Sequence, residues 1–564
     1  MIMMSMNNDG MKKCRHYSIK STKFNSIIDK IDLAHLIIII LGVMLFIFVV
    51  FPVVKIYLYP SIEDYISILS KSRSLRAIKN SLFITLISTS TATFIGFIYA
   101  YTMRYTDVPG KKFFKFISLL PLLSPPFVVA LAWILLFGRR GLITYELFNT
   151  HWNIFGWKGL WLVQSFAFFP YSYLIIDGVL KGINPSLEYA AQNAGANGFY
   201  VFRTITLPLA LPGILNAITL VGIYVLADFG NPIVIAGSWP VLPTEIFGRI
   251  SGHYDLVGAT GLAAVLVIPT FGLFVLNRTM LRGKSFATIT GKGTGLEKPL
   301  ITGTVKWLLF GFCLFIILTI ISVYGILLIG SFTTTWGSDW SFSLKNWYIV
   351  FGTKSRSLYN SIIYALFAGG GAAVFSLFAT YFIYGKSFIG KKILDFLVIL
   401  PAAIPGIFLG VGFLLAFNNP PLLLTGTSLI IILGLMVWNI PLGYQACTAN
   451  FEQITSEIEE GAISLGANSI QVFKDIMFPL LKSPFLAGFI MGFLRSITNL
   501  SIVIFLISPG KNTATAEILS LIQYAELEPA IAMCIALVGI ALLVISITQL
   551  FLGRGMDMFT RGGL

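Results

Sequence analysis

The sequence predicts an all-α membrane protein with about twelve membrane-spanning helices, arranged as two parallel six-helix repeats. Three observations lead to this fold class. The chain of 564 residues is 56% hydrophobic and only 11% charged, whereas soluble domains carry about 25% charged residues. Apolar runs that reach the roughly 20 residues needed to cross a bilayer recur along the whole chain. Short sequence signatures of the first half return in the second half at a fixed spacing.

Six spans are expected in the first half, each a helix because lipid offers backbone groups no hydrogen-bond partners. The first span follows a basic tail and is too long and too late in the chain for a cleaved signal peptide. The expected spans are 36–59, 81–101, 116–137, 160–180, 214–236 and 256–276.

The second half repeats this arrangement after a polar stretch. Its expected spans are 307–328, 362–384, 396–417, 429–446, 485–507 and 530–552. The expected organisation is a basic cytoplasmic tail (1–34), a first half (35–280, core 80–276), a cytoplasmic linker (281–304) and a second half (305–564, core 360–552).

The net charge of +15 is compatible with a nucleic-acid binder or with a membrane protein that retains Lys and Arg in its cytoplasmic loops. If the chain starts in the cytoplasm, the loops after spans two, six and eight are cytoplasmic, and they carry Arg104, Lys111, the stretch 278–298 and Lys386. Topology therefore explains the charge. Both termini are expected in the cytoplasm. The protein is expected to interact with the lipid bilayer and not with nucleic acid. The scattered Cys and His residues show no ligand spacing, and no metal site is expected.

The two halves are related by matching signatures. The repeated residues, all 280 positions apart, are Asn80 and Asn360, Ser81 and Ser361, Pro121 and Pro401, and Pro125 and Pro405. Because each half contributes the same number of spans in the same orientation, the repeats are parallel and related by an axis along the membrane normal. A central pathway between the halves is the expected consequence.

Two loop segments, 184–209 and 455–480, follow the fourth and tenth spans and align without a gap at an offset of 271. Each is expected to form a helix–turn–helix on the cytoplasmic side. Asn184 and Thr455 are candidate N-caps, and a glutamate in the first turn complements the helix dipole. A glycine ends the first helix, and a proline stops the second. The matched residues are Glu188 and Glu459, Ala191 and Ala462, Gly195 and Gly466, and Pro208 and Pro479.

The pattern Glu-x-Ala-Ala-x-x-x-Gly, nine residues, Ile-x-Leu-Pro resembles the cytoplasmic loop of binding-protein-dependent ABC importer permeases. The second copy departs from it at Gly461 and Phe478. The resemblance implies a permease of the type I ABC importer fold, in which the loop forms a coupling helix that fits a cleft on a separate ATPase. The residues that would carry the coupling are Glu188, Ala190, Ala191, Gly195, Pro208, Glu459, Ala462, Gly466 and Pro479.

A fused permease with six spans per half resembles the ferric-iron subgroup, as do the stretches 227–247 and 494–506. Fused aminoethylphosphonate and thiamine permeases are similar enough to stay open as alternatives. From a different class, a stand-alone secondary transporter also stays open, although inverted repeats would be expected of it.

The resemblance implies that this chain is not an enzyme and binds no cofactor. ATP and Mg would be used by a partner ATPase homodimer, and an extracytoplasmic binding protein would deliver the substrate. The expected location is the bacterial inner membrane, with several passes.

Asp228 in the fifth expected span and Arg495 in the eleventh are charges inside the membrane, each costing roughly 2.5 to 3.5 kcal/mol at a central position. The 271 offset makes Asp228 equivalent to Asn499, one turn after Arg495. We expect these three residues to form a pair or polar cluster between the halves, beside the pathway. A structural ion pair and a direct contact with a passing ion both remain open.

Overall fold

The computed structural model describes residues 33–150, 152–281 and 301–552. Most of the expected basic tail (1–34) and of the expected linker (281–304) lies outside the described residues. The described chain is helical apart from one two-stranded sheet.

The first half runs from α2 to α15. Its elements are α2 (Leu33–Leu45), η1 (Phe46–Val50), α3 (Phe51–Leu58), α4 (Ile62–Ser70), α5 (Ser72–Tyr105), α6 (Lys111–Ser118), α7 (Leu120–Leu123), α8 (Phe127–Phe137), η2 (Leu142–Leu147), α9 (Trp157–Gly182), α10 (Pro185–Asn193), α11 (Gly198–Val201), η3 (Phe202–Thr206), α12 (Leu207–Leu226), α13 (Gly230–Ile235), α14 (Leu242–His253) and α15 (Leu256–Leu281).

The second half runs from α16 to α26. Its elements are α16 (Gly303–Ser331), β1 (Thr333–Thr335), β2 (Asp339–Phe342), α17 (Lys345–Phe351), α18 (Ser355–Phe378), η4 (Ala379–Tyr384), α19 (Lys391–Ile399), η5 (Leu400–Ala403), α20 (Gly406–Ala416), α21 (Ser428–Phe451), α22 (Ser456–Ser464), α23 (Ser469–Gln471), η6 (Val472–Met477), α24 (Phe478–Ile497), η7 (Val503–Phe505), α25 (Ala514–Gln523) and α26 (Leu527–Leu552). Strands β1 and β2 pair antiparallel.

The expected number of spans is confirmed. Within the described residues, eleven helices are long and apolar enough to cross a membrane, or twelve if one sharply bent pair is counted as a single span. Large apolar side chains such as Leu86, Phe94, Phe315 and Phe367 are exposed on these helices. Lipid is the natural solvent for such a surface, because in water it would favour association.

The third and ninth spans, expected at 116–137 and 396–417, are each broken into shorter helices. The chain bends by 113° between Lys391–Ala403 and Gly406–Ala416. Extended residues separate α7 from α8 and η5 from α20, at Ser124 and Ile404. The repeated prolines explain the break, because a proline lacks the N–H of the helical ladder and disfavours a helical residue before it.

The fifth and eleventh spans end earlier than expected. Helix α12 stops at Leu226 and α24 at Ile497, whereas the apolar runs continue to about 236 and 507. Hydropathy does not detect these ends, since the residues beyond them are also apolar. Asp228 and Asn499 therefore lie in the breaks just beyond the two helices and not within them.

Each half is built around three long helices. Helices α5, α9 and α12 pack together in the first half, and α18, α21 and α24 in the second. Small residues permit the close approach. A Cβ added to Gly96 of α5 would lie 2.6 Å from the Ser172 Cβ atom of α9, and one added to Gly369 of α18 would lie 2.6 Å from the Phe493 backbone nitrogen of α24.

The first span of each half packs against the other half. Helix α3 contacts α20, where a Cβ added to Gly412 would lie 3.1 Å from Ile56 and 3.2 Å from Pro52. Reciprocally, α16 contacts α8 and α5, and the Tyr324 hydroxyl lies 2.7 Å from the Ser124 hydroxyl at the break of the third span. The two halves are thus joined by an exchange of their outermost helices.

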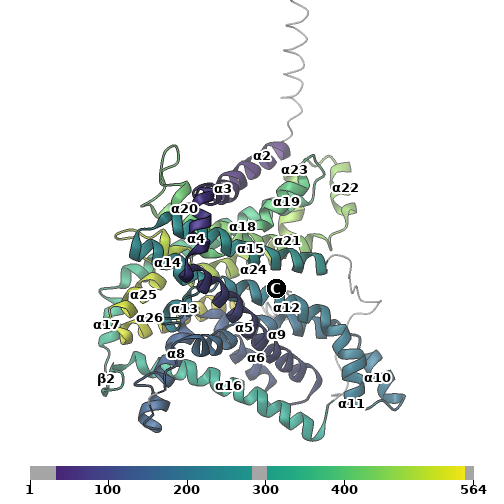
Figure 1. The fold of residues 1–564 in the computed structure, drawn as a ribbon. Coiled ribbons are helices and arrows are strands. Elements are labelled where there is room, and N and C mark those ends of the chain that lie inside the picture. The colour runs from purple at the N-terminus through teal and green to yellow at the C-terminus, as the bar shows by residue number, and fades with distance from the viewer. Residues whose placement is uncertain (1–32, 151, 282–300, 553–564) are drawn as a thin grey trace, which may run out of the picture.

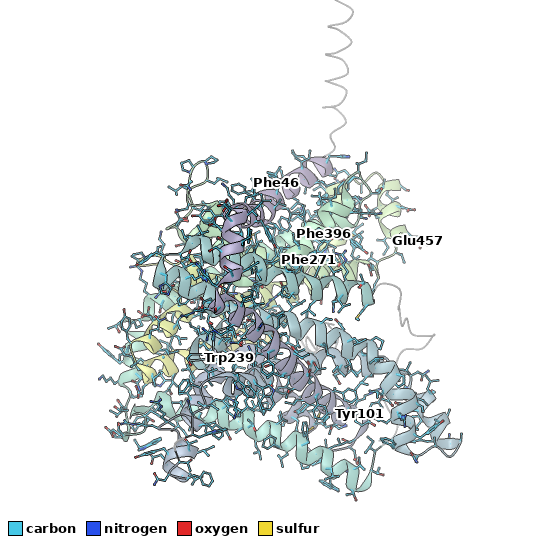
Figure 2. The ribbon with its side chains drawn as sticks, in the orientation of Figure 1. Phe46, Tyr101, Trp239, Phe271, Phe396 and Glu457 are labelled. Atoms are coloured by element: carbon cyan, nitrogen blue, oxygen red, sulfur yellow. The ribbon has the colours of Figure 1, made fainter. Side chains whose placement is uncertain are left out.

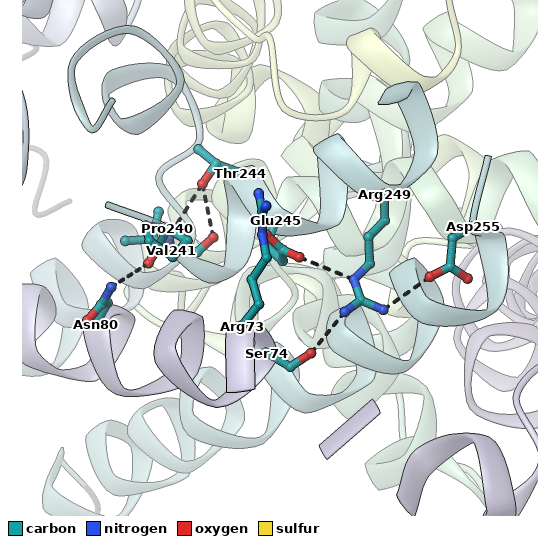
Figure 3. Close-up of polar contacts among 9 residues, drawn as sticks. All are labelled: Arg73, Ser74, Asn80, Pro240, Val241, Thr244, Glu245, Arg249 and Asp255. Atoms are coloured by element: carbon teal, nitrogen blue, oxygen red, sulfur yellow. Dashed lines mark hydrogen bonds and ion pairs between the residues drawn. The ribbon is translucent and has the colours of Figure 1, made fainter. Parts of the chain in front are cut away.

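The repeated Asn-Ser pairs make equivalent hydrogen bonds in the two halves. The Asn80 amide donates to the Pro240 carbonyl, as Figure 3 shows, and the Asn360 amide donates to the Asn512 carbonyl. Each adjoining serine hydroxyl accepts from a backbone N–H at the start of the helix it faces, Ser81 from Leu242 and Ser361 from Ala514. The spacing of 280 therefore reflects one structural unit used twice.

Both loop segments lie on the same side of the molecule. In Figure 1, α10 and α11 are at the lower right edge and α22 and α23 at the upper right, while α17, α25 and β2 are at the left. A partner that approached from one side would therefore reach both segments.

Candidate functional site

The first loop segment folds as its sequence predicts up to its turn. The Asn184 side chain caps α10 by accepting from the Ser186 backbone N–H at 3.0 Å, and Pro185 is at the first helical position. Gly195 has φ of +91° and ends the helix in a conformation that disfavours other residues. The Asn197 side chain then caps α11 by accepting from the Tyr200 N–H at 2.8 Å.

Glu188 bonds α10 to the end of η3, the π-helical turn that leads into α12. Its side chain is almost fully buried and accepts a hydrogen bond from the Thr206 hydroxyl at 2.6 Å. Burial raises the pKa of the Glu188 carboxyl, and the Thr206 hydroxyl and the positive charge of Arg104 oppose that rise. The glutamate thus holds the loop from beneath, in addition to any effect on the helix dipole.

The second loop segment is held by different contacts. Glu459 forms an ion pair with the Lys386 ammonium group and accepts from the Tyr381 hydroxyl at 3.2 Å. Thr455 occupies the N-cap position, but its side chain makes no capping bond, unlike Asn184. Gly466 has φ of +90° and repeats the turn at Gly195. The loop geometry is repeated, while its anchorage has diverged.

Pro208 and Pro479 do not stop the second helix of their segments, contrary to expectation. Each lies at the second position of a long span that continues without interruption from the loop. A π-helical turn, Phe202–Thr206 or Val472–Met477, directly precedes each span. The wider turn accommodates a proline, which would otherwise lose a hydrogen bond and clash with the carbonyl four residues earlier.

Both segments expose large apolar side chains, and α22 also exposes Glu457 and Glu460. Leu187 is 51% exposed, Phe199 71% and Leu465 91%. Figure 2 shows Glu457 of α22 at the right edge of the molecule. Of the other residues singled out from the sequence, those exposed are Ala190, Gly195, Gly466, Pro208 and Pro479, and those half-buried are Ala191 and Ala462. A Cβ added to Gly195 or Gly466 would meet no atom within 4 Å.

Among the described residues, a large and a small cavity lie between the halves. The large cavity, of about 490 Å³, is lined by α12, α15, α20, α21 and α24, and includes Arg278 and Arg495. The small cavity, of about 140 Å³, is lined by residues near the four span breaks, and includes Asp228, Arg495 and Asn499. Arg495, Tyr224 and Trp438 line both. Along α12, the large cavity lies nearer the loop segments.

Asp228 and Asn499 are equivalent caps at the two breaks. The Asp228 carboxylate accepts from the Asn231 backbone N–H at 3.3 Å, and the Asn499 side chain accepts from the Ile502 N–H at 3.0 Å. Asp228 also accepts from the side-chain amides of Gln164 at 3.0 Å and Asn231 at 2.9 Å. These bonds account for a buried carboxylate without a cationic partner.

Asp228, Arg495 and Asn499 line one cavity between the halves, but Asp228 and Arg495 do not form an ion pair. The Arg495 guanidinium lies over the Trp438 ring, 4.0 Å from its centre. Asp228 instead takes its bonds from amides, as described above. Both residues line the small cavity, as the repeat geometry predicts.

A polar network joins the start of α5, helix α14 and Asp255, which directly precedes α15, at the side away from the loop segments (Figure 3). The buried Arg249 donates to Asp255 at 3.1 Å, to the Ser74 hydroxyl at 2.9 Å and to Glu245 at 3.4 Å. The more exposed Arg73 contacts Glu245 at 2.7 Å. No sequence pattern indicates this network.

The sequence also gives little indication of the anchors of the loop segments. From the sequence, Lys386 is interpreted only as one of the positive charges of the cytoplasmic loops. Thr206 lies within the segment 184–209 and is given no role of its own. A signal exists for Thr206, since a buried first-turn glutamate needs a donor. None exists for Lys386, which lies 73 positions from Glu459. Within the part of the chain that the structure describes, no group of three or more His, Cys, Asp or Glu could hold a metal ion.

Comparison with known proteins reproduces the repeat. The family model for the binding-protein-dependent transport system inner membrane component matches residues 92–282 and again 372–557. The chain is 35% identical to the ferric transport system permease protein FbpB of Actinobacillus pleuropneumoniae, over 89% of this chain and 76% of that protein. It is 34% identical to a putative ferric transport system permease protein of Haemophilus influenzae, over 85% and 78%. A molybdenum transport system permease protein of Escherichia coli is 33% identical over 31% of this chain.

Proposed function

Because the chain belongs to the family of binding-protein-dependent transport system inner membrane components, and so is an ABC importer permease, we propose that it carries ferric iron across the inner membrane. It is a multi-pass membrane permease and not itself an ATPase. The names of its relatives support the cargo: the two relatives at 34% and 35% identity, matched over most of this chain, are called ferric transport permeases.

The loop segments are the proposed docking sites for a pair of ATPase subunits. The observation that carries this is the presence of two segments on one side of the molecule, each held by a buried or paired glutamate and each exposing large apolar side chains. A short helix with exposed Leu187 or Leu465 fits a partner that offers an apolar cleft. ATP and Mg would be bound by that partner, an ATPase homodimer, and none by this chain.

In this proposal, a loaded extracytoplasmic binding protein docks on the opposite side. The chain ends would lie in the cytoplasm, as the loop charges favour. Closure of the ATPase dimer would move α10 and α22, and through them α12 and α24, which continue directly from the loop segments. These two helices border the large cavity, so the movement would change access to it.

Co-purification with the ATPase tests the docking. Gly195→Arg with Gly466→Arg should abolish co-purification and transport, because both positions are open toward a partner. Gly195→Ala with Gly466→Ala imposes the same backbone strain with a small side chain, and should retain most binding. Equal loss in both double variants would mean that backbone strain, and not the partner surface, explains the defect. Retained coupling in the arginine variant would refute the docking assignment.

The cargo is tested by uptake of radioactive ferric iron into vesicles that contain the permease, its ATPase and the loaded binding protein. ATP-dependent accumulation is expected. Uptake of aminoethylphosphonate or thiamine, with no iron uptake, would replace the proposed cargo and leave the docking assignment intact.

A further inference from the structure

Arg495 is a cation between the two halves whose charge is not neutralised by any carboxylate in the described residues. It is half-buried, lines both cavities, and rests on the face of Trp438. Stacking on the ring fixes the plane of the guanidinium but leaves its edge free for hydrogen bonds. A charge held at this depth without an ionic partner is costly, so a ligand that supplies the opposite charge would bind well.

Among the described residues, the lining of the large cavity offers no carboxylate to neutralise Arg495. Its described lining contains two arginines and no carboxylate, and its other polar side chains include the amides of Asn216, Asn277 and Gln445. Arg278 is balanced by Asp395, 3.5 Å away. Asp395 also accepts from the Tyr444 hydroxyl at 2.6 Å. Arg495 therefore supplies the uncompensated positive charge.

The small cavity does not neutralise Arg495 either. Asp228 is the carboxylate among its described lining residues, and its oxygens are already occupied by Gln164 and Asn231. Releasing Asp228 to pair with Arg495 would leave those buried donors unsatisfied, which is unfavourable. The existing bonds keep the two charges separate.

We propose that Arg495 is the anchor of an oxyanion site, and that a phosphate or carboxylate bound to the cargo passes this point together with it. The inference deepens the proposed function and rests on it for the cargo. A bare trivalent cation would be repelled by the guanidinium, whereas a hard cation that is already coordinated by oxyanions has little or no positive charge left. Guanidinium groups recognise carboxylate and phosphate through paired hydrogen bonds.

Equilibrium binding of labelled inorganic phosphate and of citrate to the complete permease–ATPase complex in lipid nanodiscs tests the site without transport. Arg495→Gln should weaken binding by about tenfold or more, as loss of a hydrogen bond between charged groups does. Arg495→Lys should retain part of the affinity. Lys482→Gln, an exposed position on the same helix, removes a positive charge and should leave binding unchanged. Equal binding by the wild type and Arg495→Gln, or binding of neither anion by the wild type, would overturn the site.

Transport with two labels tests the joint passage. Proteoliposomes that receive binding protein loaded with radioactive iron and phosphate should accumulate both, and Arg495→Gln should lose both while the Lys482→Gln control keeps them. Entry of iron without any labelled oxyanion overturns the proposal. If the wild type takes up no iron, the ferric cargo is wrong, and phosphate binding still decides the site. If Arg495→Gln binds phosphate normally but leaks protons, Arg495 is a barrier to cations and the oxyanion site is refuted.

Discussion

The bond between Thr206 and Glu188 allows the anchorage of the first loop segment to be tested quantitatively. Thr206→Val keeps the shape of the side chain and removes the hydroxyl that donates to Glu188 at 2.6 Å. Both side chains are almost fully buried, so water cannot replace the lost donor without opening the contact. A hydrogen bond to a charged group contributes about 1.5–3 kcal/mol. The ratio of docked to undocked α10 should therefore fall roughly 10- to 150-fold at neutral pH.

The pH dependence is set by the pKa of Glu188. Burial raises that pKa above its ordinary value, so the docked loop binds a proton more tightly than the undocked loop. This contribution to docking is complete below the ordinary pKa, about 4.3, and is lost as the pH rises through the raised pKa. Because the Thr206 hydroxyl holds the pKa down, Thr206→Val raises it further. Its defect should be largest at about pH 8 and shrink on acidification.

Hydrogen exchange of the backbone over 185–197, in the complete complex at several pH values, measures docking directly. The matched control is Thr204→Val, since the Thr204 hydroxyl donates to the Tyr200 carbonyl and does not contact Glu188. Combining Thr206→Val with Glu188→Gln should restore part of the protection, because a neutral amide without a partner costs less to bury than a carboxylate that has lost its donor. A defect in Thr206→Val that is independent of pH, or that Glu188→Gln does not relieve, would refute this account of the anchor.

Two further predictions concern stability and are measured by thermal unfolding of the purified complex. Arg249→Met should destabilise by about 1–3 kcal/mol, because it removes the buried guanidinium that donates to Ser74, Glu245 and Asp255, while Glu245 keeps its pair with Arg73. Arg73→Gln, at an exposed position, should cost less than about 1 kcal/mol; similar losses in both would contradict the assigned burial. Gly96→Ala should destabilise by about 1–3 kcal/mol through collision with Ser172 of α9. Gly272→Ala, where an added Cβ meets no atom within 4 Å, should be neutral or better, and a large loss there would show that the open space is misjudged.

Features carried by local chemistry were predictable from the sequence. The turn at Gly195 needs a positive φ, which glycine adopts without strain, and the cap at Asn184 needs a side-chain acceptor before a free N–H. These requirements act within a few residues and recur at the same spacing in the second half. The number of spans was predictable for a similar reason, since hydrophobic length alone fixes how many helices cross a bilayer.

Features that depend on contacts between distant segments were not predictable. The ends of α12 and α24 lie inside continuous apolar runs, and only Asp228 and Asn499 mark them, as caps of the segments that begin at the breaks. From the sequence, both residues are interpreted as charged or polar groups of a pathway, and a capping role is not indicated. The pairing of Glu459 with Lys386 depends on how α22 returns to the membrane domain, which no local pattern specifies.

The exchange of the outermost helices has a consequence for biosynthesis. The ribosome completes α3 early, but the surface that receives Pro52 includes Gly412, which emerges only after most of the chain has been made. Until then α3 has its contact with α15 of its own half but lacks this second packing surface. Conversely, the surface of α8 that α16 packs against has already been synthesised when α16 emerges. Packing of the first half is therefore completed only when the second half inserts. If the two halves were synthesised separately, α3 would lack its contact with α20, and α16 its contacts with α8 and α5, until the halves associated.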